Sequence, residues 1–128
     1  LDVRHKARKD HMTILRKIRQ VIRGSDHPLT AKDVCEQAGV STGYLAYRYP
    51  ILYKGIVEKR KAYEEEQRLK TIYRAQAAAL EYFISEKYAE APKSRKQAYR
   101  QLREETGLPK WVLKKAIQTA YAALHVGL

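Results

Sequence analysis

The stretch TAKDVCEQAGVSTGYLAYRYP, residues 30–50, decides how this sequence is expected to fold. Thr30, followed three residues later by Asp33, forms a capping-box-like pattern, which predicts the start of a short helix that runs through Ala38. Gly39 can supply the left-handed backbone conformation that commonly ends a helix. The sequence therefore predicts a short helix that stops sharply at a glycine.

A second short helix is expected directly after this turn. Ser41 caps its first turn, the helix runs from Thr42 to about Tyr49, and Pro50 terminates or kinks it. Two such helices form a helix-turn-helix, the motif that places its second helix in the major groove of DNA. The alternative is an ordinary helical hairpin, which uses the same glycine turn and the same apolar contacts.

The rest of the chain is also expected to be helical, because Gly and Pro are few and alternating β-branched runs are absent. We predict an all-α fold in which two helix-turn-helix units are joined by a long helix. The segments are 1–50 (a basic N-terminal arm and the first helix-turn-helix), 51–90 (the long connecting helix) and 91–128 (the second helix-turn-helix). Helices outside the first turn are expected over 9–23, 51–88 with a candidate break at 64–66, 95–106, and 109–124.

The long helix carries an apolar stripe and a run of alanines. Its stripe is expected to comprise Ile56, Tyr63, Leu69, Ile72, Tyr73, Leu80, Phe83 and Ile84. The alanine-rich stretch at 75–79 has small side chains, which allow a neighbouring helix to pack closely. We therefore expect this helix to contribute to a core.

An internal repeat indicates two similar units. A shift of 68 residues places Gly39 on Gly107, and it pairs Val34 with Leu102, Val40 with Leu108, and Leu45 with Leu113. In each half, an apolar residue lies five positions before the glycine, one directly after it and one six positions after it. These side chains would fill the space between two steeply crossing helices.

The charge of the chain is strongly positive and unevenly distributed. The 128 residues include 26 Lys and Arg against 14 Asp and Glu, which gives a net charge of +12. The excess lies in residues 1–30 and 91–118, whereas residues 31–90 are nearly balanced. Because cationic side chains gain affinity for phosphates through counterion release, this pattern favours two separate phosphate-facing surfaces.

The run AGVSTGYL, residues 38–45, resembles the helix-turn-helix of the TetR repressors. The longer run through residue 63 more closely resembles the C-terminal region of TniQ/TnsD-type transposition proteins. That region has a Tyr-rich recognition helix ended by Pro, then a basic helix, then a second, weaker helix-turn-helix that matches residues 95–117. The resemblance implies sequence-specific binding of double-stranded DNA in target-site selection, with other transposition proteins as partners of the remaining chain.

Departures from both families shape this expectation. The zinc-binding N-terminal part of TniQ proteins is missing, so the resemblance implies an excised DNA-reading tail. A TetR-like repressor fragment is the alternative. However, residues 64–128 are too short to form a ligand-binding dimerisation domain, and their C-terminal part is too basic for one. A third possibility is an adaptor that binds RNA or an acidic protein through the same basic faces.

The geometry of a helix in the major groove predicts the roles of residues in the first unit. The N-terminal residues of a recognition helix face base edges, whereas residues one turn later reach phosphates. The candidates are Ser41, Thr42, Gly43 and Tyr44, followed by Tyr47, Arg48 and Lys54. Leu45 is expected to face inward, and Tyr49 is the tyrosine expected to join the core.

The second unit offers a more basic set of candidates. They are Arg95 and Lys96 on its first helix, with Arg100 and Arg103 as further phosphate clamps, and Lys110, Trp111, Lys114, Lys115 and Gln118 after the turn. Core packing is favoured for Trp111 over contact with the sugar-phosphate backbone. Arg4, Lys6, Arg8 and Lys9 form the N-terminal arm, which would enter a minor groove or remain flexible.

Other classes of function are disfavoured. A single Cys35 allows neither an internal disulfide nor a Cys-based zinc site, and the four His show no metal-ligand spacing. We therefore expect no enzyme activity, no cofactor and no metal. No apolar run approaches the length of a membrane span, so a cytoplasmic location without membrane contact is expected. The start at Leu1 indicates a fragment of a longer protein.

Overall fold

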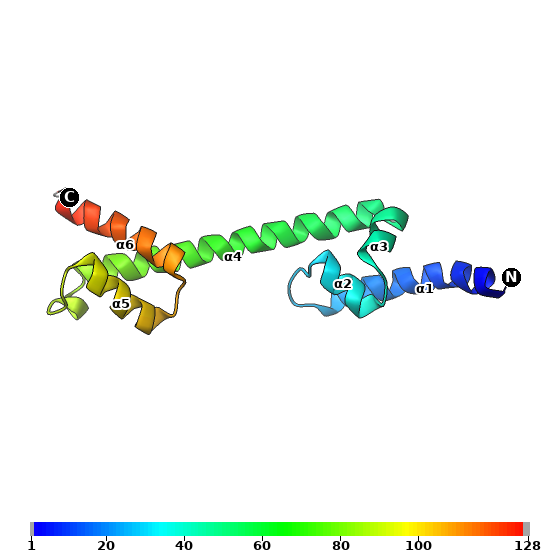
Figure 1. Ribbon diagram of the computed structural model, residues 1–128, viewed down its shortest axis with the longest axis horizontal. Coiled ribbons are helices and arrows are strands. Elements are labelled where there is room, and N and C mark those ends of the chain that lie inside the picture. The colour runs from blue at the N-terminus through cyan, green and yellow to red at the C-terminus, as the bar shows by residue number, and fades with distance from the viewer. Residues whose placement is uncertain (1, 127–128) are drawn as a thin grey trace. The chain divides into compact units, whose positions relative to one another are not determined.

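The computed structural model describes the backbone of residues 2–126 and the side chains of residues 11–126. Its regular elements are all helical, which confirms the all-α class, and residues 2–126 contain no strand (Figure 1). The elements are α1 (Asp2–Gly24), α2 (Ala31–Ala38), α3 (Thr42–Arg48), α4 (Pro50–Ile84), the 3-10 helix η1 (Glu86–Tyr88), α5 (Arg95–Thr106) and α6 (Lys110–His125).

The chain divides into two compact units, unit 1 (residues 1–65) and unit 2 (residues 66–128). We expected the long helix to be a separate connecting segment. The boundary instead lies within α4, and each part of this helix supplies side chains to the core of its own unit. Each unit therefore has a core of its own.

The helix ends follow the predicted caps closely. The side chain of Thr30 accepts a hydrogen bond from the backbone N–H of Asp33, and that of Ser41 accepts one from Tyr44. Gly39 ends α2 with a φ of 75°, and Gly107 ends α5 with a φ of 68°, both in the left-handed region where a Cβ is disfavoured. The two turns were thus correctly predicted from local sequence.

Two helices differ in extent from the prediction. α1 begins at Asp2 rather than at residue 9, so the backbone of the expected basic arm is helical, and the side chains of that arm lie outside the described residues. α4 begins at Pro50, whose fixed φ suits a first helical position, and it ends at Ile84 before η1 rather than near residue 88.

The candidate break in the long helix at residues 64–66 is absent. Two ion pairs between residues four apart flank this acidic run, with Arg60 Nε 2.7 Å from Glu64 Oε1 and Lys70 Nζ 3.3 Å from Glu66 Oε1. Pairs at this spacing lie on one helix face and stabilise the helix slightly. The acidic run therefore continues α4 and does not interrupt it.

The core of unit 1 is small and draws on every helix of the unit. Its buried residues are Ile18 from α1, Val34, Cys35 and Ala38 from α2, Leu45 from α3, and Ile56 from α4. Leu45 is fully buried, as predicted. Tyr49 is half-buried and packs against this core, which agrees with its expected place.

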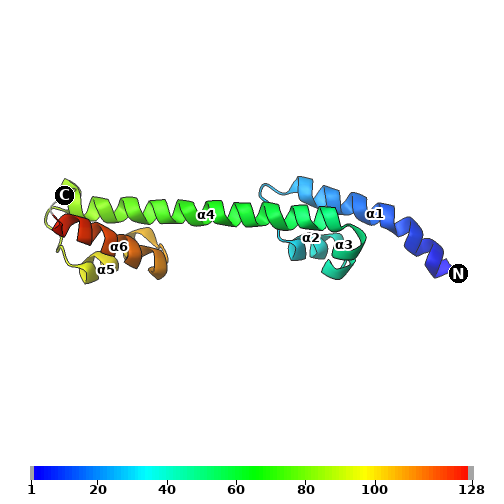
Figure 2. The ribbon, with the colours of Figure 1, turned by 90° about the horizontal axis from the view of Figure 1, so that it is seen from above.

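The core of unit 2 corrects the predicted apolar stripe of the long helix. Ala75 and Ala79 are fully buried, with Tyr82 and Phe83 beside them, whereas four members of the stripe are exposed: Leu69, Tyr73, Leu80 and Ile84. Figure 2 shows α5 and α6 on the same side of this part of α4. The small alanines face the core, as expected, and they direct several larger apolar side chains to solvent.

Tyr82 connects the end of α4 to the segment before α5. Its ring is fully buried, and its hydroxyl donates a hydrogen bond to the carbonyl oxygen of Pro92. The ammonium of Lys93 donates to the backbone carbonyls of Tyr82 and Tyr88, at 2.7 and 2.5 Å. Burial raises the pKa of the Tyr82 hydroxyl above its usual value, with a further contribution from the charge of Glu105.

We expect Tyr82→Phe to lower the free energy of unfolding by about 1 kcal/mol, because the Pro92 carbonyl loses its donor. Because the pKa of Tyr82 is raised in the folded state, its neutral form stabilises the fold below about pH 10, and this contribution is lost as the pH rises further. The free energy of unfolding of the variant should therefore also fall less steeply as the pH rises above about 10. Urea denaturation across pH measures both effects, and Tyr73→Phe, at an exposed tyrosine, should change neither.

Candidate nucleic-acid interface

The turn between α2 and α3 determines which face of α3 is exposed in unit 1. Val34, five residues before Gly39, and Leu45, six residues after it, are both buried, and Val40 is half-buried against the same core. The inward face of α3 is therefore held by apolar contacts. Its opposite face remains free.

Unit 2 repeats this pattern at the shifted positions. Leu102, Leu108 and Leu113 have 1%, 5% and 0% of their surface exposed and share one core, while Gly107 supplies the left-handed turn. The burial predicted from the repeat is confirmed at these positions. In both units, the helix after the glycine thus has one apolar face in the core and one polar face outside.

The outer face of α3 is exposed and carries little charge. Ser41, Thr42 and Gly43 are exposed, and Tyr47 has 90% of its surface exposed. A Cβ added to Gly43 would meet only the Ser41 Oγ, at 3.9 Å, so the backbone here is open to a close approach. Arg48 is the only ionisable cation of this seven-residue helix.

Tyr44 is held against α1 and is less exposed than Thr42, Gly43 and Tyr47 on the same helix. Its hydroxyl lies 2.5 Å from Nδ1 of His11, and the two rings stack with centroids 5.6 Å apart. The hydroxyl of Tyr49 donates to the backbone carbonyl of His11 at 3.2 Å. Burial raises the pKa of Tyr44 above its usual value. These contacts join α3 to α1 and engage the hydroxyl that we expected to face a base.

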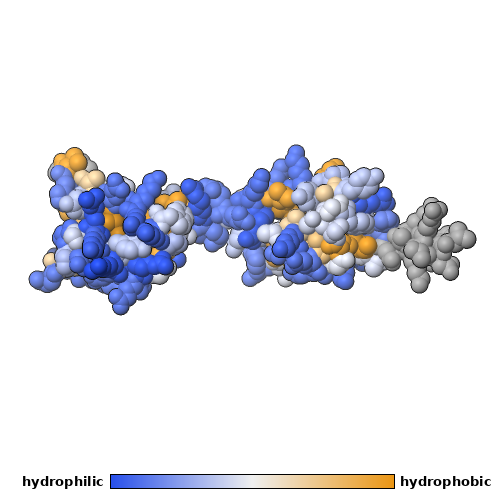
Figure 3. All heavy atoms as spheres, viewed as in Figure 1, coloured by the Kyte–Doolittle hydropathy of each residue, from blue (hydrophilic) through white to orange (hydrophobic). Residues whose placement is uncertain are grey.

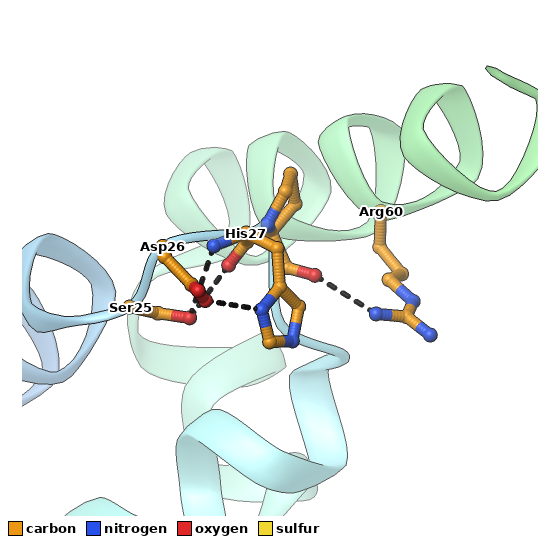
Figure 4. A network of polar contacts seen from close by, with 5 residues as sticks. Ser25, Asp26, His27 and Arg60 are labelled. Carbon is orange, nitrogen blue, oxygen red and sulfur yellow. Dashed lines mark hydrogen bonds and ion pairs between the residues drawn. The ribbon is translucent and has the colours of Figure 1, made fainter. Parts of the chain in front are cut away.

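The loop before α2 is held by a second polar network (Figure 4). Arg60 of α4 donates to the backbone carbonyl of Pro28 at 3.0 Å, and His27 Nδ1 lies 2.6 Å from Asp26 Oδ1. The hydrogen bond from His27 lowers the pKa of Asp26. Arg60 is therefore a structural cation, whereas Lys54, one of the expected phosphate contacts, is exposed on the same helix.

Unit 2 has a groove between α5 and α6 that gathers most of its predicted site residues. We call it the basic groove, and it is lined by Arg95, Lys96, Tyr99, Arg100, Lys110, Lys114, Ile117 and Gln118. Five of these side chains are cations and none is a carboxylate. Among the described residues, no ion pair involves any of the five.

Aromatic rings hold two of these cations in place. The Nζ of Lys114 lies 5.7 Å from the ring centroid of Tyr99, and the guanidinium carbon of Arg95 lies 5.0 Å from that of Tyr121. Tyr99 was not identified from the sequence, although its position four residues after Arg95 placed it on the same face of the helix.

The visible face of unit 2 in Figure 3 is mostly hydrophilic, with small apolar areas.

Trp111 and Lys115 lie outside the basic groove. They line a separate hollow of unit 2 with Arg68, Ile72 and Gln76 of α4. Trp111 has 55% of its surface exposed, so its predicted place in the core was wrong. Val112, Leu113, Ala116 and Ile117 already occupy the buried positions of α6, which turns Trp111 toward solvent.

Arg103 has a structural contact in place of the expected free guanidinium. It donates a hydrogen bond to the carbonyl oxygen of Leu108, directly after the Gly107 turn. The Arg103 side chain, which belongs to α5, thereby stabilises the turn that follows this helix. The position of Arg103 in the sequence, one residue after buried Leu102, did not predict this hydrogen bond.

Comparison with known proteins gives no match to a protein-family model, a curated protein or a solved structure. Within the part of the chain that the structure describes, no three His, Cys, Asp or Glu residues are grouped as metal ligands would be. None of the described helices combines the length and apolar character needed to cross a membrane.

Proposed function

We propose that this chain binds double-stranded DNA sequence-specifically through two helix-turn-helix units, α2–α3 and α5–α6, and selects a target site for DNA transposition. The observation that carries DNA binding is the basic groove of unit 2, whose lining has five cations and no carboxylate, and none of the five forms an ion pair with a described residue. Such a surface attracts a phosphate backbone and releases its condensed counterions on binding. The transposition role rests on the resemblance of residues 38–63 to TniQ/TnsD-type proteins.

The two units have different roles in this proposal. The basic groove binds phosphates, which contribute affinity and orientation but carry no sequence information directly. The outer face of α3 reads bases, because Thr42, Gly43 and Tyr47 are exposed and the face bears a single cation. Tyr47 replaces Tyr44 as the main aromatic contact, since the hydroxyl of Tyr44 is engaged by His11.

Selection from a library of random DNA duplexes tests the proposal. We expect one enriched motif that binds more tightly than random duplex, single-stranded DNA or RNA at every salt concentration. Equal affinity for all duplexes would contradict sequence-specific recognition, and preference for RNA would support the adaptor alternative. A palindromic motif released by a small molecule would favour a TetR-like repressor. A target-selection role further requires the motif to occur beside sites of transposon insertion.

Gly43→Ala tests the contact between α3 and DNA. The new Cβ meets no protein atom closer than 3.9 Å, so the variant should raise the free energy of unfolding by about 0.5–1 kcal/mol through helix propensity. A close approach of DNA to this backbone would make the same Cβ lower affinity for the selected motif at least tenfold. Gly55→Ala is the matched control, because Gly55 is also helical and has nothing within 4 Å. Unchanged motif affinity in a stabilised Gly43→Ala protein would exclude α3 from the interface.

Lys114→Ala tests the basic groove. Loss of one phosphate contact should weaken binding to the selected motif and to random duplex alike. It should also reduce the slope of log affinity against log salt by about one unit. Lys87→Ala is the control, because Lys87 is an exposed cation outside the groove that pairs with Glu81 at 3.5 Å. Titrations from about 50 to 200 mM salt measure the slope, and equal slopes for the two variants would contradict a phosphate role for the groove.

A further inference from the structure

α4 carries a second apolar face in unit 2 that no described residue covers. Leu69, Tyr73, Leu80 and Ile84 have 41%, 65%, 47% and 70% of their surface exposed. They lie four, seven and four residues apart, so at about 100° per residue they fall within roughly 60° of one another around the helix. We call this set the outer stripe.

The outer stripe faces away from the core of its own unit. The buried positions of the same part of the helix are Ala75, Ala79, Tyr82 and Phe83, and they contact α5 and α6. Four large apolar side chains in one line differ from the scattered exposed residues of ordinary surfaces, and contiguous apolar patches mark interaction sites. Spacings near 3.5 residues are those of helices that pack side by side.

We propose that the outer stripe binds the outer stripe of a second copy of this chain, with the two α4 helices antiparallel. The stripe is self-complementary about a point between Gln76 and Ala77. An antiparallel pair centred there sets Leu69 opposite Ile84 of the partner subunit, and Tyr73 opposite the partner's Leu80. Each large residue of the stripe thus meets a large apolar residue of the partner.

Charges beside the stripe favour this antiparallel direction. Lys70 and Arg74 flank the N-terminal part of the stripe, and Glu81 flanks its C-terminal part on the same side of the helix. In an antiparallel pair, the equivalent flanks of the two helices face each other. Glu81 of the partner subunit therefore lies opposite the space between Lys70 and Arg74. A parallel pair would instead set the two tyrosines at position 73 against each other, and Glu81 would not face the flank of the partner helix that carries Lys70 and Arg74.

The proposed interface is small, because four large side chains per chain give less area than a standard protein interface. We therefore expect a concentration-dependent equilibrium between monomer and dimer. Sedimentation equilibrium of the full chain, without DNA, should show an apparent mass that rises toward twice that of one chain. A constant monomer mass at the highest accessible concentration would overturn the proposal. The measurement involves no nucleic acid, so its outcome is independent of the proposed function.

Leu80→Lys tests the stripe directly. It places a cation at the centre of the interface and should weaken self-association at least tenfold. Leu80 is 47% exposed, so the helix should stay folded, which circular dichroism checks. Ile51→Lys is the matched control, because Ile51 is 88% exposed and lies on α4 in unit 1. Equal weakening by both variants would assign the association to general surface hydrophobicity, and no weakening by Leu80→Lys would overturn the role of the stripe.

Cysteine cross-linking tests the direction of the helices. Leu69→Cys and Ile84→Cys introduce thiols about 22 Å apart along one helix, and the native Cys35 is buried. Under mild oxidation, an antiparallel pair should give covalent dimers when the two variants are mixed, and few with either variant alone. Dimers of Leu69→Cys alone would indicate a parallel pair and overturn the antiparallel register. The absence of cross-links in all three samples would overturn the pairing of these stripes.

Discussion

The apolar contact across a glycine turn is the interaction on which each unit depends. In unit 1, Val34 and Leu45 join one core on either side of Gly39, and the equivalent pair in unit 2 is Leu102 and Leu113. Burial of such a side chain contributes about 1.5–3 kcal/mol, which is a large share of the stability of a small helical unit. The glycine makes the contact possible, because its left-handed backbone reverses the chain within a few residues.

This contact also determines what each unit presents to a partner. Once Leu45 is held inside, the opposite side of α3 must face solvent, and that side carries Thr42, Gly43 and Tyr47. The corresponding side of α6 carries Lys110, Lys114 and Gln118, which meet the cations of α5 in the basic groove. The two units therefore share one packing scheme but differ in the chemistry of their outer faces.

The long helix shows how small residues in a core affect the surface. Ala75 and Ala79 face α5 and α6 together with Tyr82 and Phe83. Because a helix presents only one side to its core, the large apolar residues on another side of this part of α4 point to solvent. A face that a sequence pattern assigned to the interior is thus available for a second chain.

Local sequence alone determined the all-α class, the caps and the two glycine turns, because each depends on residues within a few positions of one another. Thr30, Ser41 and the left-handed Gly39 and Gly107 are examples. The repeat also predicted the buried positions around both turns correctly, since helical spacing relates them to the turn glycine. For the same reason, six predicted residues of the second unit do line one groove.

Tertiary structure alone decided which side of α4 is buried, where Trp111 points and which polar groups are already engaged. The hydroxyl of Tyr44 meets His11, 33 residues away in the chain, and Arg60 holds the carbonyl of Pro28 across 32 residues. No local spacing encodes such contacts. They depend on which helices pack together, and that packing selects one among several apolar faces that the sequence offers.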